Sequence, residues 1–254
     1  MGSVMVRRAL TSLGAAAVLA GTASTWAAPM AVPVPRPRPA DMSGVRSPDI
    51  VPNREVPIDQ TTPGAADQHS CLESLAPAGV EFEPATSPSA ANPACRIEAP
   101  VRLKAVKVLS QPPTVIRLPD EPILSCKFVE RFGHWLRDLA GPLIAGRLNN
   151  DVKAVRTGPG YECRNRNRAE NAKLSAHAKG IALDIVSFEL ANGQNLTVKP
   201  SGDERARATV ETLRTAACGW FTTVLGPGSD AAHAEHMHVD ILPHGSSDRY
   251  RICQ

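Results

Sequence analysis

The sequence lacks several patterns, and each absence narrows the class of protein. Basic residues do not cluster apart from Arg164, Arg166 and Arg168, and the net charge is only +3, so a nucleic-acid-binding protein is not expected. No C-x-x-C pair occurs, which argues against a thiolate metal site. Charged residues make up 21% and hydrophobic residues 43% of the chain, so neither wholesale disorder nor a polytopic membrane protein fits.

The N-terminal segment has the pattern of a secretory signal. Arg7 and Arg8 precede an apolar run from Leu13 to Ala20, which is too short to span a bilayer permanently, and small residues then continue to Ala27. We therefore predict a signal peptide over residues 1–27 and export from the cytoplasm. A leader that stays uncut as an N-terminal anchor is the alternative.

The cysteines fit an oxidising compartment. They are even in number, so three disulfides are more plausible than a metal site, and the sequence does not choose among the possible pairings. The six are Cys71, Cys95, Cys126, Cys163, Cys218 and Cys253.

Residues 28–66 are rich in proline and arginine and have almost no large apolar residues. This composition predicts an extended linker, and a plain spacer is favoured over a proline-rich ligand for a partner domain. The folded domain is expected over residues 67–254.

Hydrophobic periodicity predicts helices and strands without a regular βαβ alternation. We expect short strands and turns over 71–125, a helix over 127–148 interrupted near Gly141-Pro142, a hairpin at Asn192-Gly193, a helix over 203–217 and a final strand at "HMHVDIL". The strand in "VRLKAVKVLS" changes phase, which suggests a bulge near Ala105. The predicted class is α+β: a small antiparallel sheet flanked by helices and stabilised by disulfides.

Polar residues interrupt two apolar strands in the C-terminal half. In "LSAHAKGIALDI", Asp184 faces away from the apolar set of its strand, and Gly180 lets the chain turn His177 back toward that carboxylate. In "AAHAEHMHVDI", His236, His238 and Asp240 share one strand face.

Imidazole and carboxylate groups in this number are typical of a metal centre. Three protein ligands and a water make a catalytic zinc site, in which zinc lowers the pKa of the water to about 7 and polarises a carbonyl. Ser175 is expected to act as a hydrogen-bonding neighbour and not as a nucleophile, because no G-x-S-x-G turn surrounds it.

"SAHAKGIALD" resembles the S-x-H-x-x-G-x-A-x-D signature of the LAS zinc peptidases, which include D-alanyl-D-alanine carboxypeptidases and murein endopeptidases. By motif position, the resemblance implies that His177, Asp184 and His238 bind Zn2+. The "EHMH" stretch fits both E-x-x-H, with Glu235 as the general base, and H-x-H, in which His236 assists catalysis.

From about Cys71 to Cys253 the chain is similar to the extensin-like C-terminal domain family of bacteria, on "YECR", the "GPG" turn and "AAHAEHMHVD". This likeness places Arg164 as a group that binds substrate or stabilises the oxyanion. Glu162 and Cys163 are extra residues relative to the family's Tyr-Arg pattern.

Together with the predicted export, the resemblance implies a zinc metallopeptidase of DD- or LD-type specificity in the bacterial periplasm. Its expected partner is peptidoglycan, in which it cleaves amide bonds of stem peptides or cross-links. The alternative is a non-catalytic envelope or peptidoglycan-binding protein that retains the fold.

Overall fold

A computed structural model describes residues 65–110, 113–245 and 250–254. All of these residues belong to one compact unit, residues 59–254. The predicted signal peptide, residues 1–27, and the predicted linker up to residue 64 lie outside the described residues. Within the described ranges, no helix is both long enough and apolar enough to cross a membrane.

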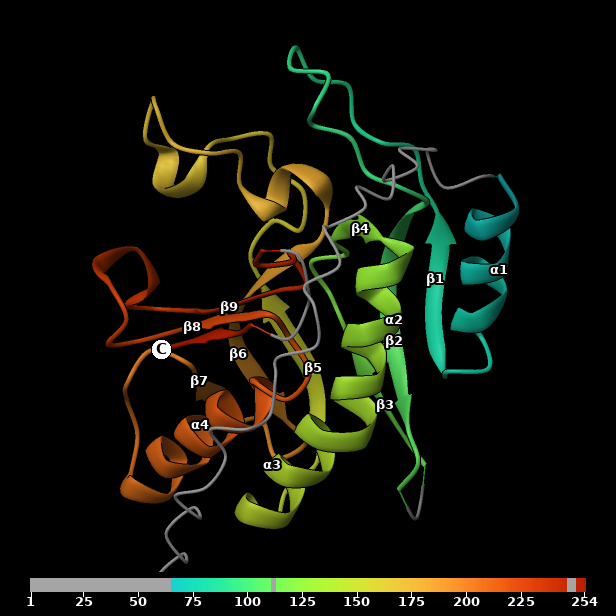
Figure 1. Ribbon diagram of the computed structural model, residues 1–254. Helices are drawn as coiled ribbons and strands as arrows, with labels where there is room; N and C mark the ends of the chain where they lie inside the picture. Colours follow the sequence, from blue (N-terminus) through green and yellow to red (C-terminus); the bar gives the residue numbers. More distant parts are fainter. Residues whose placement is uncertain (1–64, 111–112, 246–249) are drawn as a thin grey trace, which may run out of the picture. The chain divides into compact units, whose positions relative to one another are not determined.

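The described residues form a mixed α+β unit, as predicted for the fold class (Figure 1). The helices are α1 (Ala65–Leu75), α2 (Cys126–Trp135), α3 (Gly141–Leu148) and α4 (Glu204–Ala217). The strands are β1 (Val80–Pro84), β2 (Pro100–Val108), β3 (Thr114–Arg117), β4 (Ile123–Ser125), β5 (Val152–Thr157), β6 (Ala182–Leu190), β7 (Asn195–Thr197), β8 (Thr223–Leu225), β9 (Met237–Asp240) and β10 (Ile252–Cys253).

All strands of the described residues join one ten-stranded sheet, so the prediction of a small antiparallel sheet was wrong in size. The main path runs β1-β2-β3-β5-β6-β9-β8-β10, with β4 on β2 and β7 on β6. The β3–β5 and β8–β10 pairs are parallel, and the others are antiparallel. The β3–β5 contact is a single register pair, Arg117 with Ala154, which joins the N-terminal strands to the site-bearing strands.

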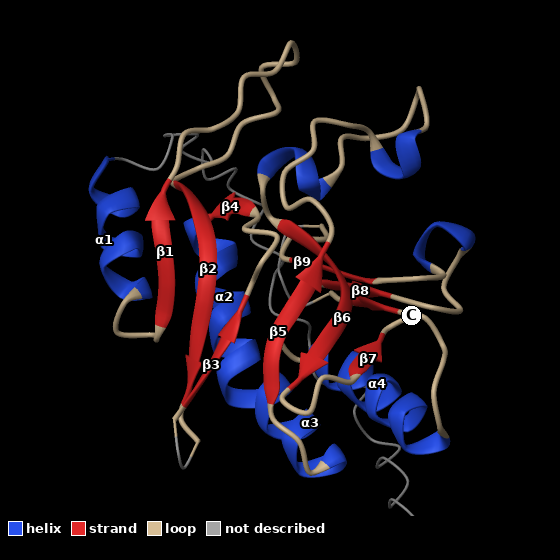
Figure 2. Ribbon diagram, turned by 180° about the vertical axis from the view of Figure 1, so that it is seen from behind, coloured by secondary structure: helices blue, strands red, loops and turns tan. Residues whose placement is uncertain are grey.

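The helices α2 and α3 pack on one face of the sheet (Figure 1). Figure 2 views the molecule from behind and shows the strands of the opposite face in front of these helices. The apolar stripe of α2 supplies fully buried rings at Phe128, Phe132 and Trp135. Phe128 and Trp135 contact the ring of Phe221 before strand β8, and Phe132 packs against both of them. Burial of such side chains contributes about 1.5–3 kcal/mol each and fixes the sheet that carries the site.

Local sequence signals account for several boundaries. The predicted helix over 127–148 is α2, a π-helix (Leu136–Ala140) and α3, so the predicted interruption before Pro142 is confirmed. Asp203 caps α4 by accepting a hydrogen bond from the amide of Ala206. The predicted hairpin joins β6 to β7, and the register shift opposite Glu81 confirms a bulge next to Ala105.

The described residues also contain three short 3-10 helices: Arg166–Arg168, Ala176–Lys179 and Ala231–His233. All six cysteines are paired, as Cys71–Cys126, Cys95–Cys163 and Cys218–Cys253, which confirms the prediction of three disulfides.

Candidate metal centre

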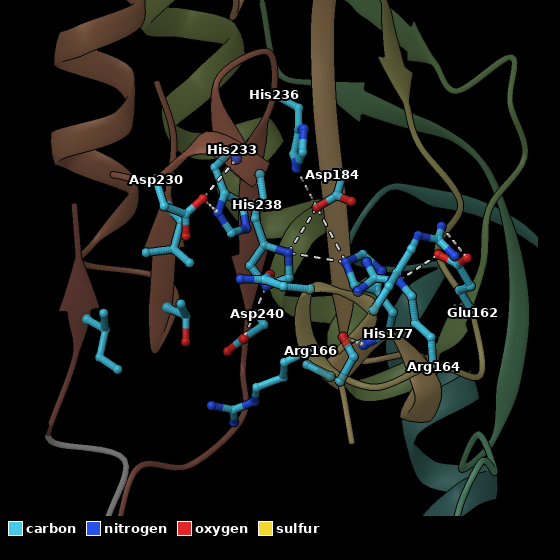
Figure 3. A pocket seen from close by; sticks show the side chains of 18 of the residues that line it. Glu162, Arg164, Arg166, His177, Asp184, Asp230, His233, His236, His238 and Asp240 are labelled. Atoms are coloured by element: carbon cyan, nitrogen blue, oxygen red, sulfur yellow. Dashed lines mark hydrogen bonds and ion pairs between the residues drawn. The ribbon is translucent and has the colours of Figure 1, made fainter. Parts of the chain in front are cut away.

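Two adjacent strands and one turn bring the predicted ligands together (Figure 3). Asp184 on β6 is the direct register partner of His238 on β9, so their side chains leave the same face of the sheet. His177 lies in the 3-10 helix before β6. The hydroxyl of Ser175 caps this helix by accepting a hydrogen bond from the His177 amide, and Gly180 closes it in the left-handed conformation (φ +64°).

Three ligand atoms form a nearly equilateral triangle. Nε2 of His177 lies 3.1 Å from Nδ1 of His238, which lies 2.9 Å from Oδ1 of Asp184. The third side, from Nε2 of His177 to Oδ1 of Asp184, is 3.3 Å. Among the described residues, His177, Asp184 and His238 form the group of histidine and acidic side chains whose ligand atoms lie close enough together to hold one metal ion.

Neighbouring acceptors orient both imidazoles. Nδ1 of His177 lies 3.1 Å from the carbonyl oxygen of Gly160, and Nε2 of His238 lies 3.2 Å from Oδ2 of Asp240. Each of these ring nitrogens must donate, since a carbonyl and a carboxylate only accept. A neutral ring then presents a lone pair on its other nitrogen, so both lone pairs face the carboxylate of Asp184.

This arrangement requires a positive charge at its centre, because three acceptors about 3 Å apart would otherwise repel one another. Either a proton on His238 or a metal cation supplies that charge. Two ligands of a tetrahedral zinc with bonds of about 2.0–2.1 Å lie about 3.3 Å apart, so the residues fit zinc in donor type and in spacing.

Electrostatics of the cluster follow from its burial. Burial alone would raise the pKa of Asp184, but its interactions with the imidazoles of His177 and His238 outweigh this effect and hold that pKa well below the ordinary value. Burial would lower the pKa of His238, but Asp184 and Asp240 together raise it to about 9. In the metal-free chain, a proton on His238 therefore replaces the cation.

His236 lies beside the cluster. Its Nε2 is 3.5 Å from Oδ1 of Asp184, and its side chain is 25% exposed in a cavity of about 510 Å³. Burial lowers the pKa of His236, and the partial opposition of Asp184 does not reverse this shift. His236 is therefore neutral at pH 7 and able to accept a proton.

His233 forms a second histidine–carboxylate pair in the same cavity. Its Nδ1 donates to Oδ1 of Asp230 at 2.7 Å, and its ring centre lies 5.3 Å from that of His236. Sequence analysis did not predict this pair, although the D-x-x-H spacing of Asp230 and His233 at the start of a short helix could have signalled the contact.

The structure does not bring Glu235 to the ligand triangle. Its carboxylate is exposed, makes an ion pair with the ammonium group of Lys199, and does not line the cavity. Glu235 lies in the bend at residues 234–236, before β9 begins at Met237, and its side chain extends toward Lys199 and away from the triangle. Of the two predicted bases, only His236 lies at the cluster.

Arg164 lines the cavity and is held by Glu162. Its Nε donates to Oε2 of Glu162 at 2.7 Å, and the other oxygen of that carboxylate pairs with Arg168 at 2.5 Å. Glu162 therefore supplies a carboxylate that fixes two arginines. Residue types alone could not predict that Glu162 holds two arginines or that the carbonyl of Gly160 orients His177.

Comparison with known proteins identifies one family. The family described as extensin-like protein C-terminus matches residues 69–254. Neither a curated protein nor a solved structure matches the chain.

Proposed function

The chain belongs to the extensin-like protein C-terminus family, and from this premise we propose that it is a zinc-dependent peptidoglycan hydrolase. In this proposal it cleaves amide bonds in stem peptides or their cross-links, in the periplasm. The observation that carries the proposal is the triangle of His177, Asp184 and His238, with its lone pairs turned inward.

Three protein ligands leave a fourth tetrahedral position for solvent or substrate, as in catalytic zinc sites. Zinc bound there would lower the pKa of a water molecule and polarise the scissile carbonyl. A site made for structure alone would close the fourth position with another ligand, whereas the cavity beside this triangle is lined by His236 and Arg164.

His236 is the proposed general base. Its neutral imidazole accepts a proton from the attacking water at Nε2, which lies on the Asp184 side of the cavity, and then returns it to the leaving amine. Glu235 is a weaker candidate, because its carboxylate pairs with Lys199 outside the cavity.

Arg164 is the proposed substrate-binding or oxyanion-stabilising group. Its guanidinium is anchored through Nε by Glu162, so the remaining N–H groups are oriented before substrate binds.

The substrate class rests on the resemblance to LAS zinc peptidases and on the predicted export. Three disulfides support an oxidising compartment such as the periplasm.

The test combines metal analysis with digestion of purified peptidoglycan. We expect one zinc per chain, and cleavage products from cross-linked muropeptide dimers that mass spectrometry identifies. His177→Ala should abolish both zinc binding and products, whereas His69→Ala, at an exposed histidine of α1, should change neither.

Stoichiometric zinc without any product that depends on His177 would instead favour the non-catalytic peptidoglycan-binding protein. Loss of products in His236→Ala with retained zinc would separate the base from the ligands.

A further inference from the structure

The arginine-rich loop beside the metal centre contains one cation that no carboxylate neutralises. Arg164, Arg166 and Arg168 all line the cavity. Glu162 pairs with Arg164 and Arg168 through its two oxygens. The guanidinium of Arg166 has no hydrogen bond or ion pair with any side chain in the described ranges, and Figure 3 shows it apart from the Glu162–Arg164 pair.

The other carboxylates of the cavity are committed to histidines. Asp184 faces His177 and His238, Asp240 accepts from Nε2 of His238, and Asp230 accepts from Nδ1 of His233. Among the described residues that line the cavity, Arg166 is therefore the arginine with its full charge uncompensated. A cation left unpaired beside a concave site attracts an anionic group of a ligand.

The backbone of Arg166 is held on both sides although its side chain is exposed. Its amide donates to the carbonyl of Lys173 at 2.9 Å, and its carbonyl accepts from Ala169 at 3.1 Å. The next two residues, Asn167 and Arg168, are both left-handed (φ 51° and 58°), a strained conformation that is unusual for residues other than glycine.

The side chain of Asn165 holds this loop through two hydrogen bonds to its backbone. Its side-chain amide donates to the carbonyls of Ala169 and Glu170, at 3.1 and 2.9 Å. The loop is thus fixed before any ligand arrives, which lowers the entropic cost of binding through Arg166.

We propose that Arg166 determines specificity by binding a free carboxylate of the peptide substrate next to the metal centre. This inference rests on the proposed function and adds a substrate class to it: peptides with a free carboxylate close to the scissile amide, in preference to the carboxamide. A guanidinium matches a carboxylate with two parallel N–H···O bonds, which gives both affinity and geometry.

The test compares two muropeptides that differ only in a free carboxylate or a carboxamide near the scissile bond. Binding is measured by calorimetry on the full zinc-loaded chain carrying His236→Ala, so that turnover does not interfere. We expect the carboxylate form to bind about tenfold more tightly, in line with a hydrogen bond between charged groups.

Adding Arg166→Gln should remove this preference by weakening only the carboxylate form, and Arg166→Lys should retain part of it. Arg205→Gln, at an exposed arginine of α4 that does not line the cavity, is the matched control and should leave the preference intact.

Equal affinity for the two forms, or an equal loss for both in Arg166→Gln, overturns the inference. Binding is measured without turnover, so its outcome is independent of whether the unsubstituted chain cleaves muropeptides. If that chain yields no cleavage products but the carboxylate form still binds more tightly, the proposed hydrolase is overturned and the inference about Arg166 is retained. Cleavage products without any preference would do the reverse.

Discussion

At the scale of single residues, the site depends on groups that orient the ligands. Asp240 fixes His238 through Nε2, so that Nδ1 points to Asp184. We expect Asp240→Asn to weaken zinc binding by about 10- to 100-fold, since removal of such a partner frees the ring and its tautomer. Competition with a chromophoric chelator measures this affinity.

Asp230→Asn is the matched control for this prediction. It removes the carboxylate partner of His233, which is a cavity histidine outside the ligand triangle. Zinc affinity should stay within about threefold of the unchanged chain. Equal losses in the two variants would show that Asp240 has no special relation to the ligand.

The raised pKa of His238 predicts a pH dependence for the metal-free chain. The folded pKa is about 9 and lies above the ordinary value of about 6.5, so the stability contributed by the imidazolium is complete below pH 6.5. It should fall as pH rises from 6.5 through 9. Urea unfolding at several pH values measures it, and His238→Gln should flatten the curve.

Zinc binding should show the opposite trend. Because His238 must release its proton to bind the metal, apparent zinc affinity should rise about tenfold per pH unit between about 6.5 and 9 and level off above that. A flat profile across this range would mean that His238 is not a ligand.

At the scale of elements, the turn into β6 has a strict backbone requirement. Gly180 is left-handed (φ +64°), and a Cβ there would meet Cγ2 of Ile97 at 2.9 Å and the amide nitrogen of Ser125 at 3.1 Å. We expect Gly180→Ala to cost about 1–3 kcal/mol of unfolding free energy and to weaken zinc binding, because His177 precedes this turn.

Gly146→Ala provides the comparison, since a Cβ at this position of α3 meets nothing within 4 Å. Its helical setting predicts a gain of up to about 1 kcal/mol and unchanged zinc affinity. Thermal unfolding measures the stability of both variants, and competition with a chelator measures their zinc affinity. Normal zinc binding in Gly180→Ala would contradict the role of this turn.

Elements with strong local signals could be predicted from the sequence. Their signals lie within short stretches of sequence: the apolar stripe of α2, the Asp203 cap of α4 and the Asn192-Gly193 turn. Helix α1 was missed, because Cys71 and its neighbours read as part of a strand-and-turn region. Strands β8 and β10, of three and two residues, are too short for any periodicity and exist through pairing with distant segments.

In the site, too, some residues have local sequence signals and others depend on contacts between distant segments. His177, Asp184 and His238 could be named from the resemblance of "SAHAKGIALD" to a known motif and from the polar residues that interrupt two apolar strands, and the structure places them together. The contact of His177 with the Gly160 carbonyl and the clamp by Glu162 depend on how the 158–175 segment folds over the sheet. No local pattern encodes that path.

At the scale of the whole molecule, disulfides hold segments that contribute to the site. Cys95–Cys163 ties the segment before β2 to the one that carries Gly160, Glu162 and Arg164, whereas Cys71–Cys126 joins α1 to α2. Removal of either pair by double serine substitution should cost about 2–5 kcal/mol. Only loss of Cys95–Cys163 should also weaken zinc binding.

Calorimetric unfolding and zinc titration of both double variants test this difference. Equal zinc affinity in the two would mean that the cavity wall keeps its position without the nearby disulfide.

The central claim is that one divalent cation is bound by two imidazoles and one carboxylate. X-ray absorption at the zinc edge of the purified full-length chain tests it most directly. We predict one zinc per chain, with nitrogen and oxygen neighbours at about 2.0–2.1 Å and the outer-shell scattering of two imidazole rings. A chain without stoichiometric zinc, or a zinc spectrum lacking imidazole scattering, would contradict the account.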